Sequence, residues 1–182
     1  MSVLFDTASL DPEARPDLWS EAHTRIFFPI AVRAAAEDLS GSRIEGHALA
    51  VATPDACAGW FAWPAQRTDG SSADRDCLPE GAHLRLDPKL DLASLHLPPI
   101  ALSIARAMQR YGMIIRDTTH SAFAFYAEDP TTGADPYDGP RGVFDGLQEW
   151  QFLPLIPWNR LQLLALARCS SVPCVSPRGP RR

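Results

Sequence analysis

The stretch from Leu78 to Asp129 decides the fold and reads LPEGAHLRLDPKLDLASLHLPPIALSIARAMQRYGMIIRDTTHSAFAFYAED. Its pattern predicts a strand, a double-proline turn, one amphipathic helix and then a two-stranded hairpin, in that order. Only in this stretch do the hydrophobic pattern, the capping residues and the turn residues all agree. It contains no catalytic signature, so it informs the fold more than the function.

The helix is expected to begin at Pro98-Pro99, because proline in a first helical turn gives up no intrahelical hydrogen bond. Gly112 follows at the position where helices commonly end in a left-handed residue. One face of the helix should be buried and the other face wet. The buried face is expected to hold Ile100, Ile104, Met108 and Tyr111, and the wet face Ser103, Arg106 and Arg110.

Alternating residues flank this helix on both sides and predict strands. Before the helix, Leu84 and Leu86 should face the core. After the helix, residues 113–116 and 122–128 should form the hairpin, with an aromatic buried face. That face consists of Phe123 and Phe125.

The other predicted elements are shorter. Residues 16–26 predict an N-terminal helix, and residues 160–167 predict a C-terminal helix whose leucines dock on the sheet. Residues 47–52 and 60–63 predict strands. The tail, residues 168–182, has no apolar periodicity and is expected to be disordered.

The composition is that of a globular chain of about one domain. The chain has 182 residues, of which 46% are hydrophobic and 17 are proline, so short elements are expected rather than a helical bundle. The net charge is −5, but residues 168–182 hold four arginines and no acid. The remaining 13 basic and 22 acidic residues give the rest a charge of −9. An acidic body argues against a nucleic-acid partner, because phosphate contacts need a basic face.

The sequence shows neither a membrane-spanning pattern nor the pattern of a signal peptide. No segment approaches the roughly twenty apolar residues of a membrane span. The N-terminus carries acids early and lacks the basic-then-apolar order of a signal peptide. We therefore expect a cytoplasmic protein with no membrane partner.

The four cysteines have no pair at the two-residue spacing of a zinc knuckle or a redox motif. They are Cys57, Cys77, Cys169 and Cys174. Cys57 and Cys77 flank a proposed loop and could form a bridge in an oxidising compartment. Because the chain shows no export signal, we expect free thiols instead.

No metal or cofactor is predicted. The histidines are scattered at positions without ligand spacing, namely His23, His47, His83, His96 and His120. Three acids of a long Gly/Pro/Asp loop, Asp129, Asp135 and Asp138, could gather a calcium ion. Their spacing matches no EF-hand, so turn formation is the favoured interpretation. Phosphate-loop, dinucleotide and nucleophile-elbow motifs are absent as well.

Residues 4–33, which contain FDTASLDPEARPDLWSEAHTRIFFPIAVR, resemble the opening of the ligand-binding and dimerisation domain of AraC-type transcription regulators. The match is carried by Phe5, Trp19, Phe27 and Pro29. The resemblance implies a ligand sensor with a cupin-like barrel. The family's helix-turn-helix units have no counterpart here, so DNA binding is not implied for this chain.

Residues 43–166 resemble the C-terminal half of a family of actinobacterial, mostly exported proteins. The match is carried by the ordered elements IEGHALA, WPAQRTDG, LPEGAHLRLDP, LPPIALSIARAMQRYGMIIRDT, AFYAED with DPYDG, and PWNRLQLL. It implies a concanavalin-type jelly roll with no established activity. The family's N-terminal half and export signal have no counterpart here, so we expect a fusion or a fragment. An open sheet edge would then favour self-association.

The jelly-roll resemblance also brings polysaccharide lyases into consideration. Such enzymes need a His or Tyr base and an Arg or Gln that neutralises a uronate carboxylate. Candidates of that chemistry are His47, Arg67, Tyr111 and Tyr126. Nothing in the sequence brings them together, and His47 and Arg67 have structural interpretations: a hydrogen-bonded strand residue and a brace for the turn at Asp69. A non-catalytic protein is therefore favoured.

Saccharide binding requires fewer precisely placed groups than lyase catalysis does. Flat aromatic faces could come from Trp60, Trp63 and Tyr126, and hydroxyl-binding groups from Arg67 and Asp69. The alternative is that the tryptophans fill the core, as large aromatic residues usually do.

Together these observations predict a mainly β protein: a partial jelly-roll or sandwich-like antiparallel sheet with a capping helix near 98–111 and short terminal helices. Three segments are expected: an AraC-like segment over 1–42, a jelly-roll-like domain over 43–167 and the tail over 168–182. The favoured function is a carbohydrate-associated binding module for a saccharide or another small molecule. The alternatives are a truncated AraC-type sensor and a lyase.

Overall fold

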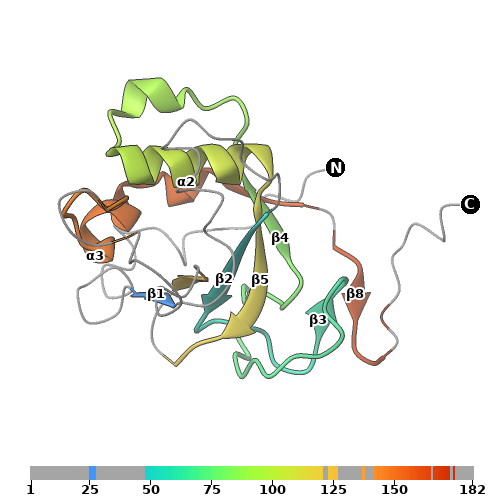
Figure 1. The fold of residues 1–182 in the computed structure, drawn as a ribbon. Helices are drawn as coiled ribbons and strands as arrows, with labels where there is room; N and C mark the ends of the chain where they lie inside the picture. The colour runs from blue at the N-terminus through green and yellow to red at the C-terminus, as the bar shows by residue number, and fades with distance from the viewer. Residues whose placement is uncertain are drawn as a thin grey trace, which may run out of the picture.

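The computed structural model describes residues 25–27, 48–120, 123–126, 137, 142–164, 166–172 and 174. They form a six-stranded open sheet in the order β1-β6-β2-β5-β4-β7, beside a two-stranded sheet of β3 and β8 (Figure 1). The strands of the large sheet are β1 (Arg25–Phe27), β2 (Leu49–Thr53), β4 (His83–Leu86), β5 (Met113–Thr118), β6 (Ala124–Tyr126) and β7 (Leu161–Leu163). The small sheet consists of β3 (Phe61–Ala62) and β8 (Arg168–Cys169). The predicted mainly β fold with a capping helix is confirmed.

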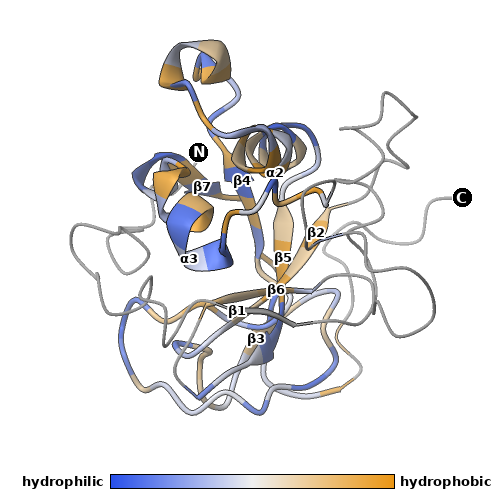
Figure 2. Ribbon diagram, turned by 60° about the vertical axis from the view of Figure 1, so that its left-hand side comes forward, coloured by the Kyte–Doolittle hydropathy of each residue, from blue (hydrophilic) through white to orange (hydrophobic). Residues whose placement is uncertain are grey.

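The central helix, α2, spans Pro99–Arg110 and begins at the predicted prolines. Ile100, Ile104 and Met108 are buried as predicted, and Gly112 has a left-handed φ of 78°. In Figure 2 the strands β2 and β5 are coloured hydrophobic where they run beneath α2. Ser103, which the pattern predicts on the wet face, is only 4% exposed. The small residues Ala101, Ala105 and Ala107 are buried with it, so the buried face is wider than the large apolar side chains indicate.

The remaining helical elements are short. They are η3 (Leu92–Leu95), α3 (Glu149–Phe152), η5 (Leu153–Leu155) and η6 (Trp158–Arg160). No helix within the described part of the chain is long and apolar enough to cross a bilayer.

The predicted hairpin of β5 and β6 is wrong, because β2 lies between them. β2 pairs in parallel with β5 and antiparallel with β6, and β1 pairs in parallel with β6. The sheet is therefore mixed rather than antiparallel. Parallel neighbours need a long crossover, and the chain from β2 to β5 provides one by way of β4 and α2.

The core on the α2 side of the sheet is aromatic at one end. Phe123 and Phe125 are buried, as predicted, and their rings meet edge-to-face at 5.7 Å. Trp158 stands 5.2 Å from Phe123, and its indole N–H donates to the Leu153 carbonyl at 2.8 Å. These contacts fix the C-terminal turns against β6.

The predicted C-terminal helix over 160–167 is wrong. The chain there forms η6 and then β7, which pairs with β4 so that Leu163 lies opposite Leu84. Leu161 and Leu163 are buried at a spacing of two, the period of a strand. The first residues of the tail expected to be disordered, Arg168 and Cys169, form β8.

The N-terminal expectations fall largely outside the described residues. Of the helix predicted over 16–26, only Arg25 and Ile26 are described, and they belong to β1. The rest of the AraC-like segment over 1–42 is not described. The described strands form an open sheet and not the closed barrel that this resemblance implies.

All four cysteines form disulfides, Cys57–Cys77 and Cys169–Cys174, so the expectation of free thiols is wrong. The pairs are 20 and 5 residues apart in the sequence. The spatial pairing of cysteines depends on how the loops fold, which spacing does not encode.

Candidate functional site

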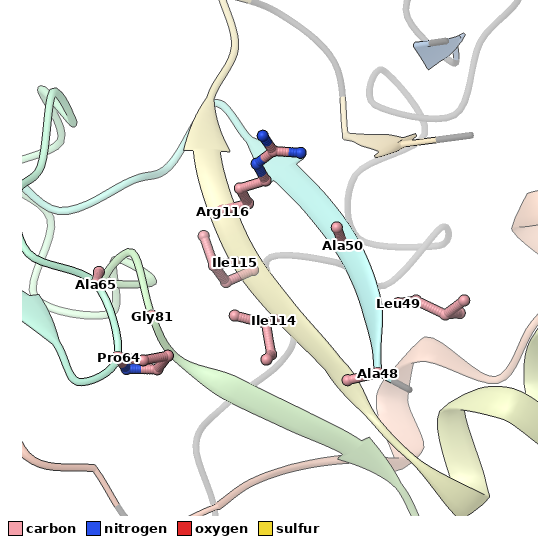
Figure 3. A pocket seen from close by; sticks show the side chains of 9 residues that line it. All are labelled: Ala48, Leu49, Ala50, Pro64, Ala65, Gly81, Ile114, Ile115 and Arg116. Carbon is pink, nitrogen blue, oxygen red and sulfur yellow. The ribbon is translucent and has the colours of Figure 1, made fainter. Parts of the chain in front are cut away.

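The face of the sheet turned away from α2 carries a cavity of about 310 Å³ (Figure 3). Alternation along β2 and β5 places Leu49, Val51 and Met113 in the core and leaves Ala50 and Ile114 half-buried. The cavity is lined by Ala48, Leu49, Ala50, Pro64, Ala65, Gly81, Ile114, Ile115 and Arg116. Its surface is therefore apolar except at Arg116.

A β-bulge next to the cavity places two charged residues on the same face. Val51 pairs with Ile115, but the next residue, Ala52, pairs with Asp117, so Arg116 is the extra residue. Without the bulge, a period of two would direct Asp117 toward the core together with Ile115. The bulge therefore sends the Asp117 carboxylate to the outer face.

Asp117 is held there by two hydrogen bonds. The Tyr126 hydroxyl donates to Oδ2 at 2.9 Å, and the Thr118 backbone N–H donates to Oδ1 at 2.9 Å. The Arg116 guanidinium lies over the Tyr126 ring, 4.9 Å from its centroid. Burial, followed by the hydrogen bond to Asp117, raises the pKa of Tyr126 to about 12. Tyr126 is thus a hydrogen-bond donor at any physiological pH.

Three carboxyl groups meet at this point. Carboxylate oxygens of Asp69, Glu80 and Asp117 all lie within 4.8 Å of one another. The Asp69 backbone N–H donates to Glu80 Oε1 at 3.3 Å. Glu80 is only 5% exposed, and this burial, together with the Asp69 carboxyl, raises the pKa of Glu80 to about 7. Near neutral pH the cluster therefore carries a proton that Glu80 can donate or take up.

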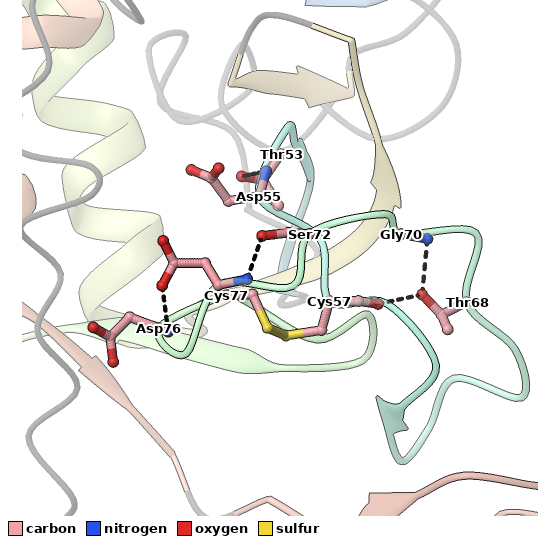
Figure 4. Close-up of a disulfide and its surroundings, with 9 residues drawn as sticks. Thr53, Asp55, Cys57, Thr68, Gly70, Ser72, Asp76 and Cys77 are labelled. Atoms are coloured by element: carbon pink, nitrogen blue, oxygen red, sulfur yellow. Dashed lines mark hydrogen bonds between the residues drawn. A yellow bond between two sulfur atoms is a disulfide. The ribbon is translucent and has the colours of Figure 1, made fainter.

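Asp69 and Glu80 are presented by the loop between β3 and β4, which the Cys57–Cys77 disulfide ties to the segment that follows β2 (Figure 4). Thr68 caps this loop: its hydroxyl donates to the Cys57 carbonyl at 3.1 Å and accepts from the Gly70 N–H at 3.0 Å. The loop runs close to the segment that follows β2, as backbone hydrogen bonds from Ser72 to Ala56 at 2.9 Å and from Cys57 to Leu78 at 3.2 Å show.

Glycine follows each of these two acids and allows close backbone contact. A Cβ at Gly70 would lie 2.5 Å from the carbonyl oxygens of Ala56 and Cys57. Gly81 has a φ of 85°, and a Cβ there would run into the Ala62 carbonyl. The Gly81 N–H donates to the Ile115 carbonyl at 2.7 Å, which lays Glu80 alongside β5.

The structure brings together some of the predicted site residues. Asp69 is a member of the carboxyl cluster and donates its backbone N–H to Glu80. Tyr126 contacts the cluster through the hydrogen bond from its hydroxyl to Asp117. Trp63 is 44% exposed and precedes the cavity wall at Pro64. Arg67 is exposed.

Two tryptophans, Trp60 and Trp63, do not fill the core as the alternative interpretation expects. Trp60 is half-buried and lies under the Arg168 guanidinium, 4.2 Å from the ring centroid. Trp63 is exposed, so neither residue fills the core. Among the tryptophans in the described part of the chain, Trp158 does so.

The lyase candidates that the structure describes are not gathered at one site. Tyr111 stands at the C-terminal end of α2, where Arg110 lies over its ring and the His83 imidazole meets its carbonyl at 2.8 Å. His47 lies outside the described residues, as do the calcium candidates Asp129, Asp135 and Asp138.

Sequence reasoning missed Arg116, Asp117 and Glu80. The motifs Pro-Glu-Gly and Arg-Asp-Thr were visible, but only the bulge and the loop bring these side chains together. The three carboxylates form an oxygen-only donor set of the kind that suits calcium or magnesium rather than zinc.

No known family model, curated protein or solved structure significantly matches this chain. Any function must therefore be argued from the site itself.

Proposed function

We propose that this protein is a non-catalytic binding module whose outer sheet face takes a saccharide. The observation that carries the proposal is the direct continuation of an apolar cavity into a polar cluster: Gly81 and Arg116 line the cavity, and their chain neighbours Glu80 and Asp117 belong to the cluster. Ligand sites combine an apolar surface with a few convergent polar groups in this way.

The polar groups match the hydroxyl groups of a sugar. Asp69 and Asp117 offer carboxylate oxygens that accept hydrogen bonds, and the Arg116 guanidinium offers donors. The floor of the cavity at Ala50 and Ile114 is apolar, so the C–H face of a pyranose ring can pack against it. The exposed Trp63 ring, beside the wall residue Pro64, supplies a further flat apolar surface.

The charge of the cluster favours some sugars over others. Three carboxyl groups in one place repel an anionic ligand, and Arg116 offsets only part of that charge. Neutral or amino sugars should therefore bind more tightly than uronates. This preference separates the binding module from a lyase, whose substrate must carry a uronate carboxylate.

The test is a titration of the oxidised full-length chain with neutral, amino and uronate oligosaccharides, followed by calorimetry. Asp117→Asn and Tyr126→Phe should each weaken binding about tenfold, which corresponds to about 1.4 kcal/mol. Asp145→Asn removes the same charge from an exposed turn before α3, where Asn tolerates the φ of 52°, and should leave binding unchanged. Absence of saturable binding to any sugar, or equal effects of all three variants, would contradict the proposal.

A further inference from the structure

The Cys57–Cys77 disulfide links the two sides of the segment that carries Asp69 and Glu80. Asp69 lies inside the 20-residue interval that the bond closes, and Glu80 lies three residues beyond Cys77. Asp117 is on β5, in the body of the sheet. The three carboxyl groups therefore come together only if the segment is held against the sheet.

Besides the disulfide, backbone hydrogen bonds hold this segment, among them those from Ser72 to Ala56, from Leu78 to Asp55 and from Gly81 to Ile115. Residues 54–60 and 63–82 belong to no strand of either sheet, and their contacts include two isolated bridges, Ala56 with Leu78 and Cys57 with Ser72. The tip of the loop, residues 73–76, is exposed. The disulfide joins the two sides directly at those bridges, so it fixes their relative position (Figure 4).

The aromatic end of the core contains no residue of this segment, although Leu78 and Ala82 of the segment belong to the same buried cluster. The aromatic cluster of Phe123, Phe125 and Trp158 and the buried face of α2 lie on the opposite side of the sheet. The second disulfide, Cys169–Cys174, acts elsewhere: the Gln66 side chain accepts from the Cys174 N–H at 3.1 Å and donates to its carbonyl at 3.0 Å. That bond therefore braces the acid-bearing loop near its start, at Gln66, and does not join the two sides that Cys57 and Cys77 link.

We propose that the Cys57–Cys77 disulfide is a redox-dependent assembly element, so that the ligand site forms only after these two thiols have been oxidised. This inference rests on the proposed function for its ligand, but not for its geometry. Two thiols lose two electrons and two protons to a disulfide-bearing oxidant, which becomes a dithiol, and one S–S bond forms in the protein. Both cysteines are buried, so the finished bond is shielded from thiolate attack in the folded protein.

A consequence concerns the compartment in which the protein acts. Paired cysteines persist in oxidising compartments and are rare in a reducing cytosol. An oxidation-dependent site therefore fits an oxidising compartment better than the cytoplasmic location predicted from the N-terminus.

The test compares two double variants of the full chain: Cys57→Ala with Cys77→Ala, and the control Cys169→Ala with Cys174→Ala. The carboxyl carbon of Glu80 is followed by NMR against pH, and near-ultraviolet circular dichroism reports on the packing of the aromatic side chains, Trp158 of the core among them. In the first variant the core signal should persist, the Glu80 pKa should fall from about 7 toward its ordinary value of 4.5, and sugar affinity should fall at least tenfold. In the control the Glu80 titration should not move.

Several outcomes would overturn the inference. An unchanged Glu80 titration in the first variant would show that the loop stays in place without the bond. Loss of the core signal would show that the bond stabilises the whole fold rather than the site, and an equal shift in the control would show that its effect is not local. If the native protein binds no sugar, the proposed function fails, but the Glu80 titration still decides on the assembly role.

Discussion

Glu80 is the residue whose chemistry depends most on the fold around it. Its carboxyl is almost completely buried, and two other carboxyl groups lie within 4.8 Å. Its pKa of about 7 exceeds the ordinary 4.5, so between these values the folded state keeps a proton that the unfolded chain has released. The free energy of unfolding contributed by this group therefore falls as the pH rises from 4.5 to 7 and is level above that.

Glu80→Gln should remove this dependence. Gln keeps the oxygen that accepts from the Asp69 N–H but carries no charge, so the variant should be more stable than the native protein at pH 8, by about 1 to 3 kcal/mol, and little different at pH 4.5. Urea unfolding at both pH values measures this, with Asp145→Asn as the control. A Gln variant that is less stable at pH 8 would contradict the position given to Glu80.

Single residues were predictable from the sequence where their environment follows the local repeat. Leu84, Leu86 and Phe125 are buried because each lies on the core side of an alternating strand. Trp60 and Trp63 do not follow this rule, because β3 consists only of the buried Phe61 and Ala62 and the two tryptophans lie just outside it. Asp117 could not be placed, because a single bulge reverses its side of the sheet.

At the scale of the element, the turn from Glu80 to β4 depends on glycine in a way that can be measured. Gly81 has both a left-handed φ and no room for a Cβ, whereas Gly146 has a φ of 74° and nothing within 4 Å of a Cβ. A substitution at Gly146 meets only the backbone cost, and one at Gly81 meets a clash as well.

Gly81→Ala should therefore destabilise the protein by at least about 2 kcal/mol more than Gly146→Ala, for which about 1 kcal/mol is expected. It should also weaken saccharide binding, because the clash with Ala62 displaces Glu80. Chemical denaturation and calorimetry of the two variants provide the comparison. Equal losses of stability would show that the backbone of the loop moves away without cost.

Among the elements, α2 could be predicted because its prolines, its apolar spacing and Gly112 give the same answer. The segment after Trp158 could not, because Leu161, Leu163 and Leu164 fit the period of a helix and the period of a strand equally well. Pairing with β4 decides for the strand, and that contact is between residues far apart in the sequence.

At the scale of the whole molecule, the partner of each strand is the feature that the sequence does not encode locally. The pattern near 113–128 is compatible with a hairpin, yet β2 inserts between β5 and β6 and makes the sheet mixed. The disulfides follow from the same long-range arrangement. The site depends on both, since its residues come from β5, β6 and a loop tied to β2.

The sheet is open, and its described edge strands are β1 and β7. Unpaired edge strands add further strands from other copies unless charge prevents it, so we expect concentration-dependent self-association. Gln162→Glu places a charge on β7 opposite Arg85 and should reduce it, whereas Ala93→Glu on η3 should not. Light scattering after gel filtration measures both. A native protein that stays monomeric at every concentration would contradict this expectation.

The most direct test of the central claim is an NMR titration of the oxidised protein with a neutral oligosaccharide. The account predicts that the signals of Ala50 and Ile114 in the cavity and of the Glu80 carboxyl shift together with one dissociation constant, while those of Ile100 and Ile104 beneath α2 stay still. Shifts confined to other surfaces, or no shift of Glu80 when the cavity signals move, would contradict it.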